Sequence, residues 1–203
     1  MQPGECTPRW ARYWMTRKRR SWRVARAVRR TRQDFSAERE ALGSALREIN
    51  LARRAAGDER ADHLRQACLL LQIASSEERP PTEDAFEALL GHPSTRLAVY
   101  GSLAPGEQNH WVLSHLAGEW SRGSVRGVLH AEGWGACDGF PGMEWIPTAG
   151  EIPVLVFTSD DLTPHWARID AFEGGDYRRI LIPVDLDAGG LVVANIYELR
   201  REP

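Results

Sequence analysis

Apolar residues in the first half of the chain recur three and four positions apart, which is typical of amphipathic helices. Two such stripes are present, one of Leu42, Leu46, Ile49 and Ala52 and the next of Ala61, Leu64, Cys68 and Leu71. Thr82 and the acidic pair after it predict the N-terminal cap of a third, shorter helix, which ends at Gly91. Short loops between helices favour an antiparallel hairpin. We therefore predict a helical hairpin region over residues 35–92, with a role in packing or partner binding.

The second half of the chain, after Pro93, changes to short apolar runs separated by glycine. Such runs predict strands, and they fall at residues 97–100, 125–130, 154–157, 180–185 and 191–199. One helix is predicted over residues 107–116 and an amphipathic one after Thr163. The predicted fold class is therefore α+β, a small mixed β-barrel with flanking helices, preceded by the α-helical N-terminal region.

Charge is distributed unevenly along the 203 residues. Residues 1–32 carry 11 Arg or Lys against one acid, whereas the chain as a whole has a formal net charge of -2. We therefore predict that residues 1–34 form a basic, poorly ordered N-terminal arm that the fold does not need. Only residues 1–32 are suited to nucleic acid or an anionic surface. The same Arg-rich, acid-poor composition also resembles a mitochondrial transit peptide.

Cysteine usage and hydropathy indicate in which cellular compartment the protein is expected. Cys6, Cys68 and Cys137 are far apart and form no CxxC pair, which argues against a disulfide framework or a zinc site. No stretch approaches the run of about 20 apolar residues that spans a bilayer. We expect a cytoplasmic protein without a membrane span.

The segment from Val99 to Leu113 combines a strand end, a glycine turn and a predicted helix start. A turn of this kind exposes backbone N–H groups that bind a carboxylate or phosphate. Gly101 would let a ligand approach the main chain closely. Neither GxxxxGK[ST] nor GxGxxG is present, so this is not a nucleotide-binding phosphate loop.

A second candidate lies at the end of the last predicted helix. Glu173 is in its final turn, just before Gly174 and Gly175. The C-terminal end of a helix carries partial negative charge, which disfavours an anion there. One interpretation is a solvated surface carboxylate, and the other is a functional acid held at the end of an element.

Three motifs decide between these interpretations. They are Y-G-S-L-x-x-G-x-x-N-H-x-x-L at Tyr100 to Leu113, G-F-P-G-M at Gly139 to Met143, and I-D-x-F-E-x-x-x-Y-R at Ile169 to Arg178. Together they resemble the γ-glutamylcyclotransferase-like family, which includes γ-glutamylamine cyclotransferases and plant avirulence-induced-gene-like proteins. The resemblance covers about residues 97–200, so residues 93–203 are assigned to this domain.

The resemblance implies a cofactor-independent enzyme of transferase or lyase type. Its substrate would be a γ-glutamyl amine or peptide, cyclised to 5-oxoproline with release of the amine. The catalytic glutamate of the family matches Glu173, which would act as general base, with no metal and no organic cofactor. The turn that holds the substrate matches Tyr100, Gly101, Ser102 and Leu103, and Tyr177 is expected to line the same pocket.

Asn109 and His110 are expected to brace the turn rather than to react. Trp111, Trp134 and Trp145 are expected in the core or the pocket wall. Many family members have a Gly-Glu pair in the strand that here contains Val154 and Leu155, so that wall should be more apolar. The alternative function is a non-catalytic module on the same fold, which binds a small ligand or a partner and is recruited by the basic arm.

Overall fold

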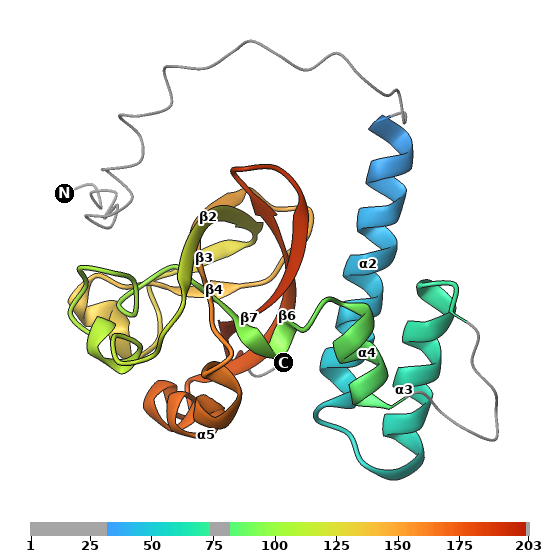
Figure 1. The fold of residues 1–203 in the computed structure, drawn as a ribbon, viewed down its shortest axis with the longest axis horizontal. Helices are drawn as coiled ribbons and strands as arrows, with labels where there is room; N and C mark the ends of the chain where they lie inside the picture. The colour runs from blue at the N-terminus through green and yellow to red at the C-terminus, as the bar shows by residue number, and fades with distance from the viewer. Residues whose placement is uncertain (1–31, 74–81, 202–203) are drawn as a thin grey trace.

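The computed structural model describes residues 32–73 and 82–201. The helical elements are α2 (Arg32–Ala52), α3 (Gly57–Leu70), α4 (Glu83–Leu89), η1 (Pro93–Thr95), η2 (His110–Val112), η3 (Trp134–Asp138) and α5 (Leu162–Glu173). The strands are β1 (Arg96–Val99), β2 (Glu119–Arg126), β3 (Val128–His130), β4 (Gly142–Glu144), β5 (Glu151–Thr158), β6 (Tyr177–Leu186) and β7 (Leu191–Leu199). Figure 1 shows the strands at the centre, with α2, α3 and α4 on one side.

Five strands close into a barrel in the order β1-β5-β2-β6-β7. Neighbouring strands run antiparallel, except that β1 pairs with β7 in parallel. Strands β3 and β4 form a separate two-stranded sheet. These findings confirm the predicted α+β class with a small mixed barrel and flanking helices.

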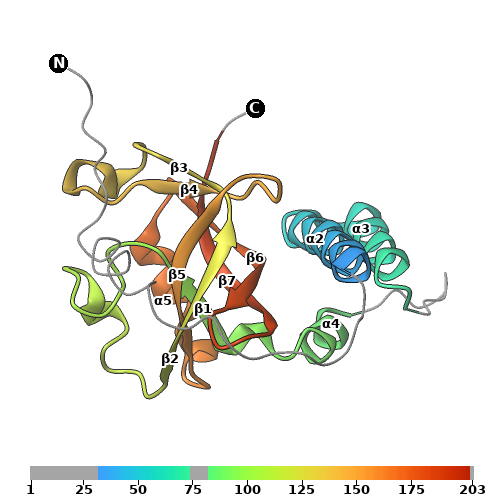
Figure 2. The same ribbon diagram turned by 90° about the horizontal axis from the view of Figure 1, so that it is seen from above.

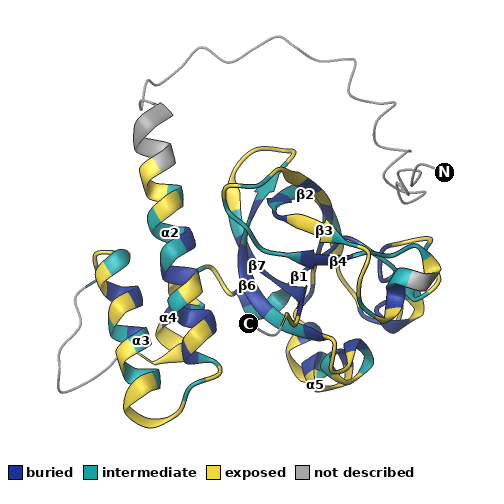
Figure 3. Ribbon diagram, turned by 180° about the vertical axis from the view of Figure 1, so that it is seen from behind, coloured by how far each residue is buried: buried dark blue, intermediate teal, exposed yellow. Residues whose placement is uncertain are grey.

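Two apolar cores fill the barrel and its cover. One includes Val125, Val156, Ile182 and Ile196, and the other joins Leu113, Phe157 and Ile169 beneath α5. Strand β7 is buried at every position of residues 193–199, so both of its faces are covered, and β6 is likewise buried at consecutive positions over residues 180–182. Figure 3 shows the buried residues concentrated on these strands.

The helices α2, α3 and α4 pack on the outside of the barrel. Their apolar core contains Leu46, Ile49 and Phe86 together with Leu181 of β6 and Val193 of β7. Figure 2, seen from above, also places α2 beside β6, with α3 on the far side of α2. Segments 101–118 and 133–141 lie on the far side of the barrel from these helices.

Local signals account for the short helix α4. The Thr82 hydroxyl accepts a hydrogen bond from the Ala85 N–H at 3.3 Å, as predicted for an N-terminal cap. Gly91 adopts a φ of 71°, the left-handed region in which glycine carries no steric penalty.

The predicted helix over residues 107–116 is wrong. Only the 3-10 helix His110–Val112 forms there, between turns. The Asn109 side chain donates to the Ser102 hydroxyl at 3.0 Å, and its backbone N–H donates to the Ser102 carbonyl at 3.0 Å. Asparagine that bonds to nearby groups in this way competes with helical backbone hydrogen bonds.

Two further expectations need correction. The strand expected from Val125 begins six residues earlier, at Glu119, because the polar residues at its start carry no hydrophobic pattern. Trp111 was expected in the core or pocket wall, but it is 61% exposed, and its ring makes a T-shaped contact with Phe172. The predicted arm, residues 1–34, lies outside the described residues except for its last three, which begin α2.

Within the described ranges, no helix combines the length and apolar character needed to cross a bilayer.

Candidate active site

The turn after β1 forms one side of a pocket. Ala104 N–H donates to the Gly101 carbonyl at 3.1 Å, which closes the turn. The Asn109 amide reaches Ser102 Oγ at 3.0 Å, and His110 Nδ1 donates to the Leu103 carbonyl at 3.1 Å. The prediction that Asn109 and His110 brace this turn is confirmed.

Backbone donors remain unused in the same turn. Among the hydrogen bonds of the described residues, none is donated by the N–H groups of Gly101, Ser102 or Leu103. Backbone N–H groups away from bulk water are normally paired. Three successive unpaired donors beside a pocket are therefore suited to hold an anion.

Gly101 is compatible with a close ligand approach rather than with a backbone constraint. It is absent from the glycines with positive φ. A Cβ added there would meet the Phe140 side chain at 3.8 Å, which is an ordinary van der Waals contact. A larger side chain would therefore occupy the pocket without straining the turn.

Glu173 lies on the other side of the pocket, as the last residue of α5. The helix ends because Gly174 turns away with a φ of 72°, while its N–H still bonds to the Asp170 carbonyl at 3.1 Å. Glu173 is 9% exposed, and no described residue donates a hydrogen bond to its carboxylate. Burial, and secondarily the Asp170 carboxylate, raises the pKa of Glu173 to about 7. A buried acid with this pKa is protonated and ionised in comparable amounts near neutral pH.

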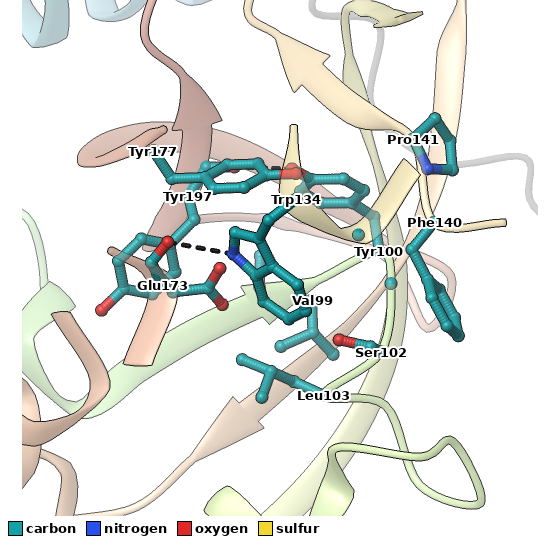
Figure 4. A pocket seen from close by; sticks show the side chains of 13 residues that line it. Val99, Tyr100, Ser102, Leu103, Trp134, Phe140, Pro141, Glu173, Tyr177 and Tyr197 are labelled. Carbon is teal, nitrogen blue, oxygen red and sulfur yellow. Dashed lines mark hydrogen bonds between the residues drawn. The ribbon is translucent and has the colours of Figure 1, made fainter. Parts of the chain in front are cut away.

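Tyrosines line the base of the pocket, which Figure 4 shows from close by. The Tyr100 hydroxyl donates to the Tyr197 carbonyl at 2.9 Å and accepts from Met143 N–H at 3.2 Å, so it is used in joining strands. The Tyr177 hydroxyl makes no hydrogen bond to a described residue, and burial raises the pKa of Tyr177 to about 12. Tyr177 therefore remains a neutral donor available to a ligand.

The third side of the pocket is the segment that carries η3. Trp134, Phe140 and Pro141 line the pocket, and Trp134 Nε1 donates to the Glu173 carbonyl at 3.0 Å. Gly133 allows this segment to lie close, since a Cβ there would come within 2.2 Å of the Tyr177 hydroxyl oxygen. Gly142 likewise allows the chain to lie close to Leu199, since a Cβ there would come within 2.2 Å of the Leu199 side chain.

All six residues predicted for the site line this one pocket. They are Tyr100, Gly101, Ser102, Leu103, Glu173 and Tyr177. Sequence reasoning missed Phe140, Pro141 and Tyr197. The G-F-P-G-M motif contained the signal for the first two. Tyr197 had none, because strand alternation does not say what lies opposite a side chain. Among the described side chains, no group of three or more His, Cys, Asp or Glu is placed to hold a metal ion.

Comparisons with known proteins follow the same division of the chain. The family model described as Gamma-glutamyl cyclotransferase, AIG2-like, matches residues 97–203. No curated protein matches the chain.

Solved structures also resemble this part of the chain. YkqA from Bacillus subtilis is 28% identical, over 52% of this chain and 36% of its own length, with a TM-score of 0.42. An AIG2-like protein from Mus musculus is 21% identical, over 54% of this chain and 79% of its own, with a TM-score of 0.42. An uncharacterized protein from Pyrococcus horikoshii is 24% identical, over 54% of this chain and 80% of its own length, with a TM-score of 0.36.

The match therefore spans little more than a third of the Bacillus protein. Within this chain, however, the family model extends from β1 to the C-terminal residue and covers more than half of the sequence. The chain belongs to the Gamma-glutamyl cyclotransferase, AIG2-like family.

Proposed function

We propose that the protein cyclises a γ-glutamyl amine or γ-glutamyl peptide to 5-oxoproline and releases the amine. The observation that carries this proposal is the buried Glu173 carboxylate, which has no hydrogen-bond donor among the described residues. It shares a pocket with the N–H groups of residues 101–103, which have no acceptor among the described residues. A base and an anion cradle on opposite sides of one pocket suit a substrate that carries both an ammonium and a carboxylate.

The proposed reaction needs no nucleophile from the protein. The α-ammonium of the substrate gives a proton to Glu173, and the free amine attacks the γ-carbonyl carbon of the same molecule. A new C–N bond closes the five-membered lactam, and the bond to the leaving amine breaks. Glu173 then returns its proton to the departing nitrogen, which also receives the second proton that the attacking nitrogen loses as the lactam forms, so the amine leaves as an ammonium ion. Because the nucleophile and the electrophile belong to one molecule, the chemistry uses no metal and no organic cofactor.

The turn would position the substrate by its charge. We assign the N–H groups of Gly101, Ser102 and Leu103 to the α-carboxylate or the developing oxyanion. Within the described lining of the pocket no arginine or lysine is present, so these dipoles replace a cation. A substrate held in this folded conformation has its amine next to its own carbonyl. This proximity lowers the entropic part of the activation free energy.

The remaining walls would receive the ring atoms and the leaving group. The Tyr177 hydroxyl, which has no acceptor among the described residues, is assigned to the substrate. Trp134, Phe140 and Pro141 make one wall aromatic and apolar. This composition supports an amine without negative charge as the leaving group.

The decisive experiment measures 5-oxoproline by mass spectrometry after the purified full chain is incubated with a panel of γ-glutamyl compounds. The panel includes γ-glutamyl alkylamines, γ-glutamyl-ε-lysine and γ-glutamyl dipeptides. We expect stoichiometric 5-oxoproline and free amine from at least one member. Absence of product from every member would overturn the enzymatic proposal and favour the alternative of a non-catalytic binding module recruited by the basic arm.

A further inference from the structure

A second carboxylate links the end of α5 to the strands that carry the pocket tyrosines. Asp170 Oδ1 accepts from the Tyr197 hydroxyl at 2.6 Å and from Arg179 Nε at 2.9 Å. Asp170 Oδ2 accepts from Arg179 Nη2 at 3.1 Å. Both oxygens of this carboxylate are therefore fixed, in part by a bidentate guanidinium.

The strand register makes this arrangement possible. Arg179 of β6 lies directly opposite Tyr197 of β7, so both side chains are on the same face of the sheet. The neighbouring pair, Arg178 and Glu198, lies on the other face of the sheet, where Arg178 Nε donates to Glu198 Oε2 at 2.9 Å. A register slip of one residue would remove both partners of Asp170.

Asp170 is close to Glu173 in the helix. Residues three apart share a helix face, and the Asp170 carbonyl also accepts the N–H of Gly174, the residue after Glu173. On its other side, the Arg179 guanidinium lies 4.3 Å from the ring centroid of Trp166, one turn earlier in α5. The cluster of Asp170, Arg179 and Tyr197 thus holds the last turns of α5 on the barrel.

The other ionisable groups in the described lining of the pocket are neutral hydroxyls. Tyr100, Tyr177 and Tyr197 face it from the end of β1, from β6 and from β7, and burial raises the pKa of each of them. Among the described residues that line the pocket, only Glu173 can be charged near neutral pH. The nearest fixed negative charge to act on it is Asp170.

We propose that Asp170 is a positioning residue for Glu173, which it serves by orienting Tyr197 and the last turn of α5 and by placing a negative charge beside the Glu173 carboxylate. The role in turnover rests on the function proposed above. The orientation and the electrostatic effect do not depend on it and can be measured without a substrate.

The test is an NMR titration of the full chain labelled with [13C]glutamate, in which Glu173→Gln identifies the Glu173 carboxyl resonance. Asp170→Asn removes the neighbouring charge, so the Glu173 midpoint should fall by about half a pH unit or more. Arg179→Gln leaves the Asp170 charge without its cation, and the midpoint should rise. Asp176→Asn is the matched control, because this exposed carboxylate does not act on Glu173, and the midpoint should stay in place.

Opposite shifts in the first two variants are the signature of an electrostatic role, which mere loss of packing would not produce. An unchanged midpoint in Asp170→Asn, or an equal shift in Asp176→Asn, would overturn the inference. If Asp170→Asn does not fold, the sign of the shift in Arg179→Gln decides. Where a γ-glutamyl compound is turned over, the rising limb of kcat with pH should move in the same direction as each midpoint.

Discussion

Two buried polar side chains, one in each half of the molecule, differ in their hydrogen bonding. Asn50 of α2 lies where the helices meet the barrel, is 5% exposed, and pairs both the nitrogen and the oxygen of its amide with β6. Its Nδ2 donates to the Leu181 carbonyl at 2.9 Å, and its Oδ1 accepts the Leu181 N–H at 2.8 Å. Glu173, in the pocket on the other side of the barrel, is 9% exposed, but its carboxylate receives no hydrogen bond from a described residue.

This contrast separates stability from chemistry. A satisfied buried polar group fixes how two elements pack, whereas an unsatisfied one costs free energy and persists where function needs it. The helical half contributes no residue to the lining of the pocket, which comes from the barrel strands, the turn after β1, the segment 134–141 and the end of α5. Substitutions in the two regions should therefore have separable effects.

The largest effect is expected when Glu173, the proposed general base, is replaced. Glu173→Gln keeps the shape of the side chain but cannot accept the ammonium proton, so kcat should fall by a factor on the order of 10²–10⁴. Wild-type kcat should rise with pH through the pKa of Glu173, about 7 in the unliganded protein, and the variant should lose this limb. Steady-state 5-oxoproline assays from pH 5 to 9 provide the measurement, with the exposed Glu151→Gln as control. Near-normal turnover of the variant would place the base elsewhere.

A smaller loss is expected when the anion cradle is filled. Gly101→Val would project its side chain toward Phe140 across the pocket, so kcat/KM should fall by about 100-fold through loss of substrate binding. Ser102→Ala keeps the backbone N–H and should cost about tenfold or less, chiefly through the lost bond from Asn109. Equal tolerance of the two changes would argue against recognition by the backbone.

The unsatisfied carboxylate should also reduce stability in a pH-dependent way. The folded-state pKa of Glu173, about 7, lies above the ordinary value of 4.5, so the folded state binds more protons between these values. The free energy of unfolding should therefore fall as pH rises from 4.5 to 7, by about 3 kcal/mol in total. Between pH 5 and pH 8, Glu173→Gln should gain about 2–3 kcal/mol relative to the wild type in denaturant unfolding. Parallel pH profiles of the two proteins would contradict the buried, unpaired state of this acid.

The smallest of these effects is expected at the satisfied residue. Asn50→Ala leaves the Leu181 N–H and carbonyl without partners and should lower the free energy of unfolding by about 2 kcal/mol. Below the unfolding transition, kcat and KM should match the wild type, because the pocket lies on the other side of the barrel. Urea unfolding and steady-state kinetics on the same preparation check both statements. A large kinetic effect in a fully folded variant would show that the two regions are coupled.

The fold and the members of the site were predictable from sequence to different degrees. Short apolar runs identified strands such as β7, and apolar residues three and four positions apart identified helices such as α3. They failed for residues 107–116, where side-chain bonds of Asn109 replaced the helix, and for the polar start of β2. The six predicted site residues depended on three family motifs, and no periodicity would have brought Tyr100 and Glu173 together.

By itself, the sequence determined which segments are amphipathic, where glycines end them, and which short motifs are shared with a family. Only the tertiary structure decided what those motifs face. The pKa of Glu173 depends on burial by chain segments far away in sequence, and the partners of Asp170 depend on the pairing of Arg179 with Tyr197 across β6 and β7. Both are properties of through-space neighbours, because desolvation and hydrogen bonding act over a few ångströms irrespective of separation along the chain.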